Sequence, residues 1–199
     1  MMAPQPGEQL RADARQNRTR LLAAATQAFA EKGADAPLED IAKRAGVGIG
    51  TLYRHFPTRL DLQGAVFRSQ VTGLCGQGDA LLEDASPEFA FSGWLTALAA
   101  YLASKRGLGK ALMESLGKDS ELMHTCWFAM RDTTERLLSS AQQAGVIRPD
   151  VAAMDVMRMV HGVVTSTESA PDQIPRLLAF ILDGLKTQPA SAFSATDPS

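Results

Sequence analysis

Residues 38–56 constrain this chain more than any other segment, because they predict two short amphipathic helices separated by a tight turn. The segment reads LEDIAKRAGVGIGTLYRHF. Ile41 lies on the inner face of the first helix, and Leu52 and Phe56 lie on the inner face of the second. Gly46 can adopt the positive φ that a helix end followed by a sharp turn requires. This pattern is typical of a helix-turn-helix, whose second helix can enter a DNA major groove.

The second helix of this pair, residues 49–55, has a distinct outer face. On a helical wheel Leu52 and Phe56 share the inner side, whereas Gly50 and Arg54 lie nearly opposite them. The outer side and its flanks are therefore the surface that would meet DNA. The predicted DNA-facing residues of this helix are Ile49, Gly50, Thr51, Tyr53, Arg54 and His55.

The side chains of this outer face suit a DNA groove. The hydroxyl groups of Thr51 and Tyr53 can bond phosphates, and the Arg54 guanidinium can bond a phosphate or a guanine edge. Ile49 has no donor, so its partner would be a thymine methyl group. Gly48 lets the backbone approach DNA, and free amides at a helix start favour a phosphate. An ordinary solvated helix surface is the alternative that the same residues allow.

Composition and charge are those of a globular protein, with 45% hydrophobic and 21% charged residues among 199. No apolar run reaches about 18 residues, and the N-terminus lacks the apolar core of a secretory signal, so a cytoplasmic location is expected. Residues 1–60 carry nine Lys/Arg against six Asp/Glu, whereas residues 61–199 carry eleven against sixteen. The basic N-terminal end fits phosphate binding, although a solvated tail would give the same asymmetry.

The spacing of cysteine and histidine predicts neither a disulfide nor a metal site. Cys75 and Cys126 are far apart in the sequence, so both are expected to be reduced thiols. The three histidines, His55, His124 and His161, do not have metal-ligand spacing. We therefore expect no metal and no other cofactor.

Further helix signals lie on both sides of the predicted helix-turn-helix. Residues 1–15 are polar and are expected to form a loose arm, followed by a helix over 16–32. Pro37 suits the first position of the next helix, because its φ is fixed and it lacks an amide donor. Thr58 and Asp61 have the spacing of a capping box at the start of another helix.

The helix that follows Thr58 contains three glycines, Gly73, Gly76 and Gly78, within six residues. Each costs about 1 kcal/mol relative to alanine in a helix interior, so the helix is expected to weaken, bend or end there. The glycines would then form either a hinge or a static bend.

The sequence beyond Pro87 also has helical periodicity, and no strand alternation is present. The chain is therefore expected to be all-α, with about nine helices, and a disordered tail is expected over 188–199. The remaining helices are expected near residues 87–105, 107–116, 119–144, 152–169 and 172–187.

Residues 16–65 resemble the N-terminal domain of the TetR-type transcriptional regulators. The resemblance rests on IAKRAGV and GTLYRHF, in this order and spacing, after a helix that contains Phe29 and Gly33. It implies an all-α homodimer, with a three-helix DNA-binding domain over 16–58 and a helical domain for ligand binding and dimerisation over 59–187. Most members of the family repress transcription until a small ligand releases them from the operator.

The resemblance also implies roles for single residues. It makes Thr51, Tyr53 and His55 contacts to the DNA backbone. The family often has serine and lysine where this chain has Gly48 and Ile49, so the operator sequence does not carry over from relatives. The predicted DNA-binding set is Arg18, Pro37, Gly48, Ile49, Gly50, Thr51, Tyr53, Arg54, His55, Thr58 and Arg59.

Large apolar residues are frequent between residues 89 and 130, and both a ligand cavity and an ordinary core would require them. Polar side chains such as Tyr101 and Arg131 would give a cavity its few hydrogen-bonding groups, although surface or core roles also explain them. The predicted ligand-binding set is Phe67, Trp94, Tyr101, Met113, Met123, Trp127, Arg131 and His161.

The last two predicted helices, 152–169 and 172–187, are apolar around much of their circumference. Such a helix must be covered on nearly all sides, by its own domain or by a second subunit. With the resemblance, we expect a homodimer through about residues 152–187. A two-fold dimer would place two recognition helices roughly 34–36 Å apart over a pseudo-palindromic site.

The sequence therefore favours a repressor that binds double-stranded DNA and is released by an unknown, largely apolar small molecule. The alternatives are a transcriptional activator and a constitutive DNA-binding protein without a ligand. An enzyme is not expected, because no nucleophile–base pair, metal cluster or phosphate-binding loop is visible. No membrane partner is expected.

Overall fold

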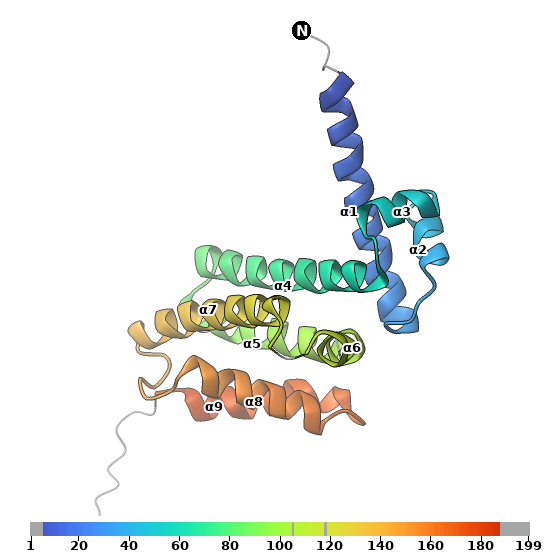
Figure 1. Ribbon diagram of the computed structural model, residues 1–199. Coiled ribbons are helices and arrows are strands. Elements are labelled where there is room, and N and C mark those ends of the chain that lie inside the picture. The colour runs from blue at the N-terminus through green and yellow to red at the C-terminus, as the bar shows by residue number, and fades with distance from the viewer. Residues whose placement is uncertain (1–5, 105, 118, 188–199) are drawn as a thin grey trace, which may run out of the picture. The chain divides into compact units, whose positions relative to one another are not determined.

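The computed structural model describes residues 6–104, 106–117 and 119–187, and these residues form an all-α fold (Figure 1). The expected fold class is confirmed. None of the helices in these ranges is long and apolar enough to cross a membrane. The elements are α1 (Pro6–Lys32), α2 (Leu38–Arg44), α3 (Ile49–His55), α4 (Arg59–Asp84), α5 (Pro87–Ser104), α6 (Arg106–Leu116), α7 (Glu121–Gln143), α8 (Ala153–Ser166), a short 3-10 turn (Pro171–Gln173) and α9 (Ile174–Leu185).

The N-terminal helix is longer than expected. α1 begins at Pro6, so the expectation of a loose arm is wrong for residues 6–15, whereas residues 1–5 and the predicted disordered tail, 188–199, lie outside the described residues. No glycine or proline interrupts residues 8–32. Helix propensity therefore extends the helix back to Pro6, where a proline fits the first turn.

Pro37 is the N-cap of α2 rather than its first helical residue. Its backbone is extended, with φ −60° and ψ 130°, and α2 starts at Leu38. The difference is one position, and the reason for a proline is the same, because the N-cap amide is not needed for an intrahelical hydrogen bond.

The turn between α2 and α3 has the conformation that the sequence predicts. Gly46 has φ 67°. Its amide donates to the Lys43 carbonyl at 3.1 Å, and the Val47 amide donates to the Ala42 carbonyl at 3.0 Å. These two hydrogen bonds form a Schellman motif, in which a side chain at Gly46 would be strained.

The start of α4 has the predicted capping box. The Thr58 amide donates to Asp61 Oδ2 at 2.9 Å, and the Asp61 amide donates to Thr58 Oγ1 at 3.1 Å. Two amides that lack intrahelical acceptors are thereby satisfied. α4 consequently begins one residue after Thr58.

α4 does not end at its glycines; it continues past Gly73, Gly76 and Gly78. Gly78 is buried, and a methyl group there would collide with Thr133 Cγ2 and lie 3.2 Å from Trp94 Cε3 and Cζ3. At Gly73 and Gly76 a methyl group would have nothing within 4 Å. Close packing therefore explains one glycine, and packing does not require the other two.

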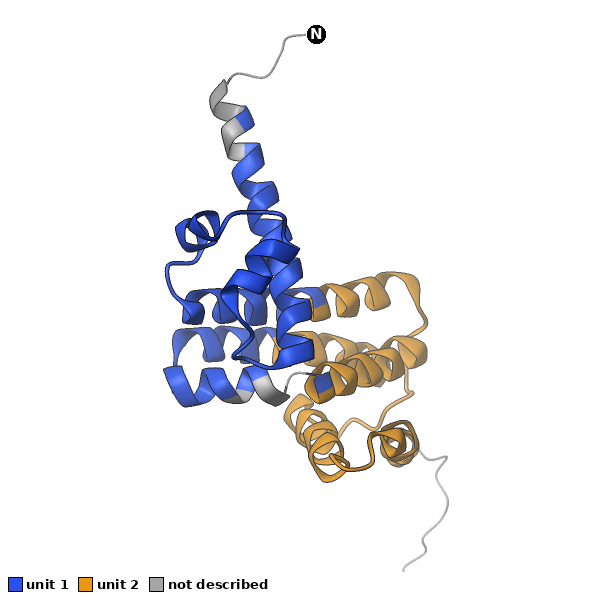
Figure 2. Cartoon of the chain, turned by 90° about the vertical axis from the view of Figure 1, so that its right-hand side faces the viewer, with its two compact units in different colours: residues 1–73, 104–129 blue, residues 74–103, 130–199 orange. Residues whose placement is uncertain are grey.

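The chain divides into two compact units (Figure 2). The first contains Met1–Gly73 and Ser104–Ala129, and the second contains Leu74–Ala103 and Met130–Ser199. This division crosses α4 and α7, because each helix packs against different neighbours along its length. The predicted functional boundary after residue 58 is a different division and stays a prediction.

The core of the first unit holds the helix-turn-helix together. Leu21 and Ala25 of α1, Ile41 of α2 and Leu52 of α3 are completely buried. Ala42 is also buried, and its small side chain permits a close helix crossing.

The core of the second unit is built around Trp94 of α5, which is completely buried. Its Nε1 donates to Thr134 Oγ1 of α7 at 3.0 Å, and that hydroxyl donates to the Met130 carbonyl at 2.8 Å. The indole therefore has a partner for its one polar group, as a buried tryptophan requires.

Candidate nucleic-acid interface

α3, the predicted recognition helix, is attached to the protein by one side. Leu52 is completely buried, and Phe56, directly after the helix, is 3% exposed. Both residues lie on the side that the helical wheel assigned to the interior. The opposite side is consequently free of contacts to the helices that hold α3.

The outer side of α3 combines apolar, hydroxyl and cationic groups. Ile49 is 38% exposed and Tyr53 is 46% exposed. Gly50 and Arg54 are also exposed. The two other predicted residues of this face are half-buried: Thr51 and His55.

The glycines at the start of α3 are not required by the protein itself. Gly48, the N-cap, has φ −72°, and neither Gly48 nor Gly50 has a positive φ. A methyl group at either position would have nothing within 4 Å. Close approach of another molecule to the backbone would explain both glycines. α3 has only seven residues, so its free amides alone do not define an anion site.

Arg18 of α1 lies beside the end of α3. Its guanidinium carbon is 5.5 Å from the centre of the Phe56 ring, in cation–π geometry, and the side chain is exposed. The His55 ring is 6.3 Å from the same phenyl ring. Phe56 therefore brings two predicted DNA-binding residues to one place on the surface.

Thr58 and Arg59 have structural partners within the protein. The Thr58 hydroxyl donates to Asp61 Oδ2 at 2.7 Å. Arg59 Nη1 donates to the Ala36 carbonyl at 2.6 Å, and its distance to the Ala34 carbonyl is 3.4 Å. Their predicted contacts to DNA would compete with these bonds and stay a prediction.

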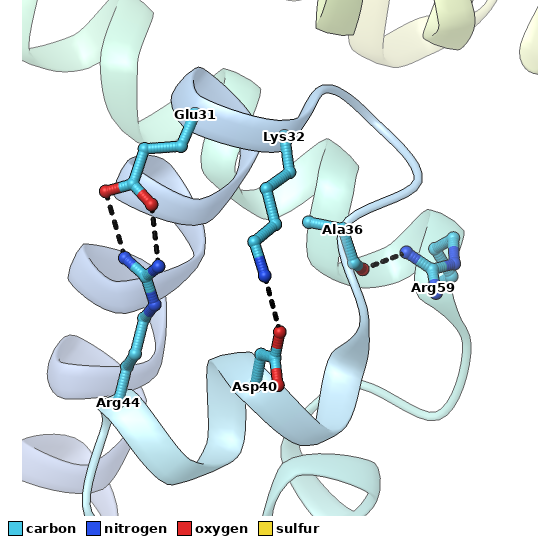
Figure 3. Close-up of polar contacts among 6 residues, drawn as sticks. All are labelled: Glu31, Lys32, Ala36, Asp40, Arg44 and Arg59. Atoms are coloured by element: carbon cyan, nitrogen blue, oxygen red, sulfur yellow. Dashed lines mark hydrogen bonds and ion pairs between the residues drawn. The ribbon is translucent and has the colours of Figure 1, made fainter.

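Two ion pairs fasten α2 to the end of α1 (Figure 3). Arg44 forms a bidentate salt bridge to Glu31, in which Nη1 lies 3.0 Å from Oε1 and Nη2 lies 2.6 Å from Oε2. Lys32 Nζ lies 2.7 Å from Asp40 Oδ2. The hydrogen bond from Arg44 lowers the pKa of Glu31, and the one from Lys32 lowers the pKa of Asp40. All four side chains are exposed enough for water and salt to weaken the attraction.

The predicted ligand-binding residues have diverse environments. Phe67, Trp94 and Tyr101 are buried, and Met123 is half-buried. The other four side chains are exposed: Met113, Trp127, Arg131 and His161. None of the eight lines the hollow beside Phe91 and Ile147, the hollow beside Phe56 and Leu116, or the hollow beside Ala34 and Ala111, so their joint role in ligand binding stays a prediction.

Two glutamines of α4 were missed in the sequence. Gln63 is 6% exposed, and its Nε2 donates to the Ala34 carbonyl at 2.8 Å. The side-chain amide of Gln70 is buried, and neither its Nε2 nor its Oε1 has a hydrogen-bond partner among the described residues. Each glutamine lies among apolar positions of a long helix, and that placement was the available signal.

The fold and this surface define the class of protein: a helix-turn-helix transcriptional regulator. Residues 21–66 match the family described as bacterial regulatory proteins of the tetR family. Residues 86–187 match the C-terminal domain described as that of an SbtR-like transcriptional regulator. The chain belongs to the TetR family, as its resemblance indicated. Regulators of this family bind DNA and dimerise.

Solved structures of the family are similar over most of the chain. A TetR transcriptional regulator from Streptomyces coelicolor is 34% identical, with a TM-score of 0.76, over 86% of this chain and 99% of that one. A TetR regulatory protein from Mycobacterium vanbaalenii is 31% identical, with a TM-score of 0.70, over 89% and 99%. An HTH-type transcriptional regulator of Staphylococcus aureus is 44% identical over 54 residues, which are 27% of this chain and 29% of that protein.

Proposed function

We propose that this protein is a transcriptional repressor in the cytoplasm that binds a pseudo-palindromic operator as a homodimer and leaves it when a small ligand binds. The outer face of α3 carries the proposal. Ile49, Tyr53 and Arg54 are exposed there, whereas Leu52 is completely buried. These three side chains match a thymine methyl group, a phosphate and a guanine edge. The proposed DNA-reading domain covers residues 16–58.

The C-terminal helices support homodimerisation through about residues 152–187. α9 contains seven large apolar residues, yet only Leu178 and Leu185 are buried within the chain. Phe180 is 62% exposed. A second copy would cover these side chains, because a helix apolar on most sides is not stable in contact with water.

The effector is proposed to bind residues 59–187 and to be largely apolar. Phe67 and Trp94 are buried, as residues that contact an apolar ligand would be. The ligand would act by population shift, favouring a form of the dimer whose recognition helices no longer match two successive major grooves.

Selection of genomic DNA fragments by the purified protein tests the proposal. We expect enrichment of one pseudo-palindromic site, with half-sites about 10–10.5 base pairs apart or a multiple of this distance. Enrichment without a shared sequence would contradict specific reading by α3. Transcription from the bound promoters, with and without the protein, distinguishes a repressor from an activator.

Replacing Ile49 by alanine tests the apolar contact. If Ile49 touches a thymine methyl group, the Ile49→Ala protein binds the selected site more weakly, by about fivefold to tenfold, and tolerates other bases at that step. Binding to sites already altered at that step stays the same. Equal weakening on every sequence would show that Ile49 does not read a base.

A further inference from the structure

A hollow of about 340 Å³ lies within the first unit, and the proposed function assigns it no role. The apolar part of its lining includes Phe56, Leu60, Leu116 and Leu122. Its volume is near the lower end of the range of small-ligand sites, which is about 300–1,000 Å³. The hollow therefore suits a small ligand.

One stripe of α4 forms a wall of this hollow. Leu60, Gly64 and Arg68 follow each other at intervals of four residues, so they share one face of the helix. Gly64 is buried, and a methyl group there would lie 3.1 Å from Leu122 Cδ2. A side chain at this position would therefore displace Leu122 by a few tenths of an ångström.

This hollow has an excess of positive charge along its lining. Arg18 and Arg68 line it, and both side chains are exposed. Asp61 also lines it, but its carboxylate accepts hydrogen bonds from the amide and the hydroxyl of Thr58. The lining therefore includes two guanidinium groups and one carboxylate, and that carboxylate is already engaged.

The two arginines have no acidic partner in the part of the chain that the structure describes. Arg18 contacts the ring of Phe56 through its guanidinium face, which leaves the N–H groups at its edge available. Arg68 makes no hydrogen bond or ion pair with any described residue. Guanidinium groups of this kind bind carboxylates and phosphates with charge-assisted hydrogen bonds.

We propose that this hollow binds a small amphipathic anion, with its carboxylate or phosphate head between Arg18 and Arg68 and its apolar body on Leu60, Leu116 and Leu122. The proposal rests on the proposed function and revises it: the effector carries a negative charge, and its site includes Arg18, His55 and Phe56 as well as residues after 58. Arg18 and His55 belong both to this hollow and to the predicted DNA-binding set. The anion and a DNA phosphate would therefore compete for Arg18 and exclude each other.

Calorimetric titration of the full-length protein, in the absence of DNA, tests the site. Octanoate and octyl phosphate are the probes, and octylammonium and acetate are the controls for charge and for the apolar body. We expect saturable binding of at least one probe and of neither control. In leucine-methyl NMR spectra, the bound probe shifts the signals of Leu60, Leu116 and Leu122.

Two variants separate the site from general attraction to a basic surface. Arg68→Gln weakens binding by about tenfold or more, because a charge-assisted bond is lost. Lys43→Gln removes one positive charge from α2, outside the hollow, and leaves the affinity unchanged. Absence of saturable binding by both probes, equal affinity in the Arg68→Gln protein, or methyl shifts confined to other leucines would overturn the site.

A second titration tests competition and keeps the two proposals apart. The probe that binds is added to the protein bound to a fluorescent duplex of its selected operator. Release that the Arg68→Gln protein resists supports the effector role, whereas a complex that persists at saturation overturns the competition. Failure to select any operator would contradict the proposed function and leave the calorimetric result standing.

Discussion

The outer face of α3 and the core around Trp94 differ in how far apart their parts lie in the sequence. The residues of α3 that are predicted to face DNA fall within seven consecutive positions, so the helical period alone decides which of them point outward. The Trp94 core joins an indole to a hydroxyl 40 residues away and to Gly78 of α4. Local periodicity therefore reveals the surface chemistry of this protein, whereas only the tertiary structure reveals the reasons for its core residues.

Replacing Trp94 by alanine has the largest expected effect. The Trp94→Ala protein loses a completely buried side chain and leaves Thr134 without its indole partner, so its free energy of unfolding falls by about 3–5 kcal/mol. Urea denaturation followed by circular dichroism measures the change. A loss below about 1 kcal/mol would show that the core relaxes around this position and that the contrast with α3 is overstated.

Replacing Tyr53 by alanine is expected to lower the affinity for DNA and to leave the stability of the protein almost unchanged. Tyr53 is 46% exposed, so the free energy of unfolding changes by less than about 0.5 kcal/mol. Affinity for DNA falls about tenfold, because a hydrogen bond to a charged phosphate is lost. Fluorescence anisotropy with specific and random duplexes should show similar losses for both. A loss limited to the specific duplex would make Tyr53 a base contact instead.

Gly76 and Gly78 of α4 form a matched pair for the same comparison, because the first is in open space and the second is closely packed. Gly78→Ala lowers the free energy of unfolding by about 1–3 kcal/mol, because the new methyl group collides with Thr133. Gly76→Ala raises it by about 1 kcal/mol, because the position is open and alanine favours a helix. Thermal denaturation of both proteins gives the two signs. If Gly76 is a hinge, Gly76→Ala also weakens the ligand response while DNA affinity stays the same.

Acid should loosen the attachment of α2 to α1 by a small amount. The pKa values of Glu31 and Asp40 are lowered by Arg44 and Lys32, so these pairs contribute stability above the ordinary carboxyl pKa values, near 4. The contribution is lost as the pH falls through the lowered values. Between pH 5 and pH 3, about one unit either side of the ordinary carboxyl pKa values, the Glu31→Gln, Asp40→Asn protein should lose less free energy of unfolding than the unchanged protein. Parallel curves for the two proteins would show that the pairs add nothing.

Much of the helix-turn-helix was predictable because its signals are local. The positive φ of Gly46, the capping box of Thr58 and Asp61, and the buried side of α3 each depend on residues fewer than six positions apart. The start of α1 was misplaced because Pro4, Pro6 and Gly7 indicated an arm, whereas the polar residues 8–15 that follow contain no glycine or proline and are compatible with a helix. The partners of Arg59, on the α1–α2 loop, come from more than 20 positions away, and no period predicts them.

The same α1–α2 loop, residues 33–37, is held by side chains that bind only its main chain. Arg59 Nη1 and Gln63 Nε2 both donate to carbonyl oxygens, those of Ala34 and Ala36. Carbonyl oxygens are present whatever the side chain. Arg59 and Gln63 therefore hold the loop through atoms that every residue has, and the limits on its sequence come instead from Gly33, which has φ 78°, and from Ala36, which is buried.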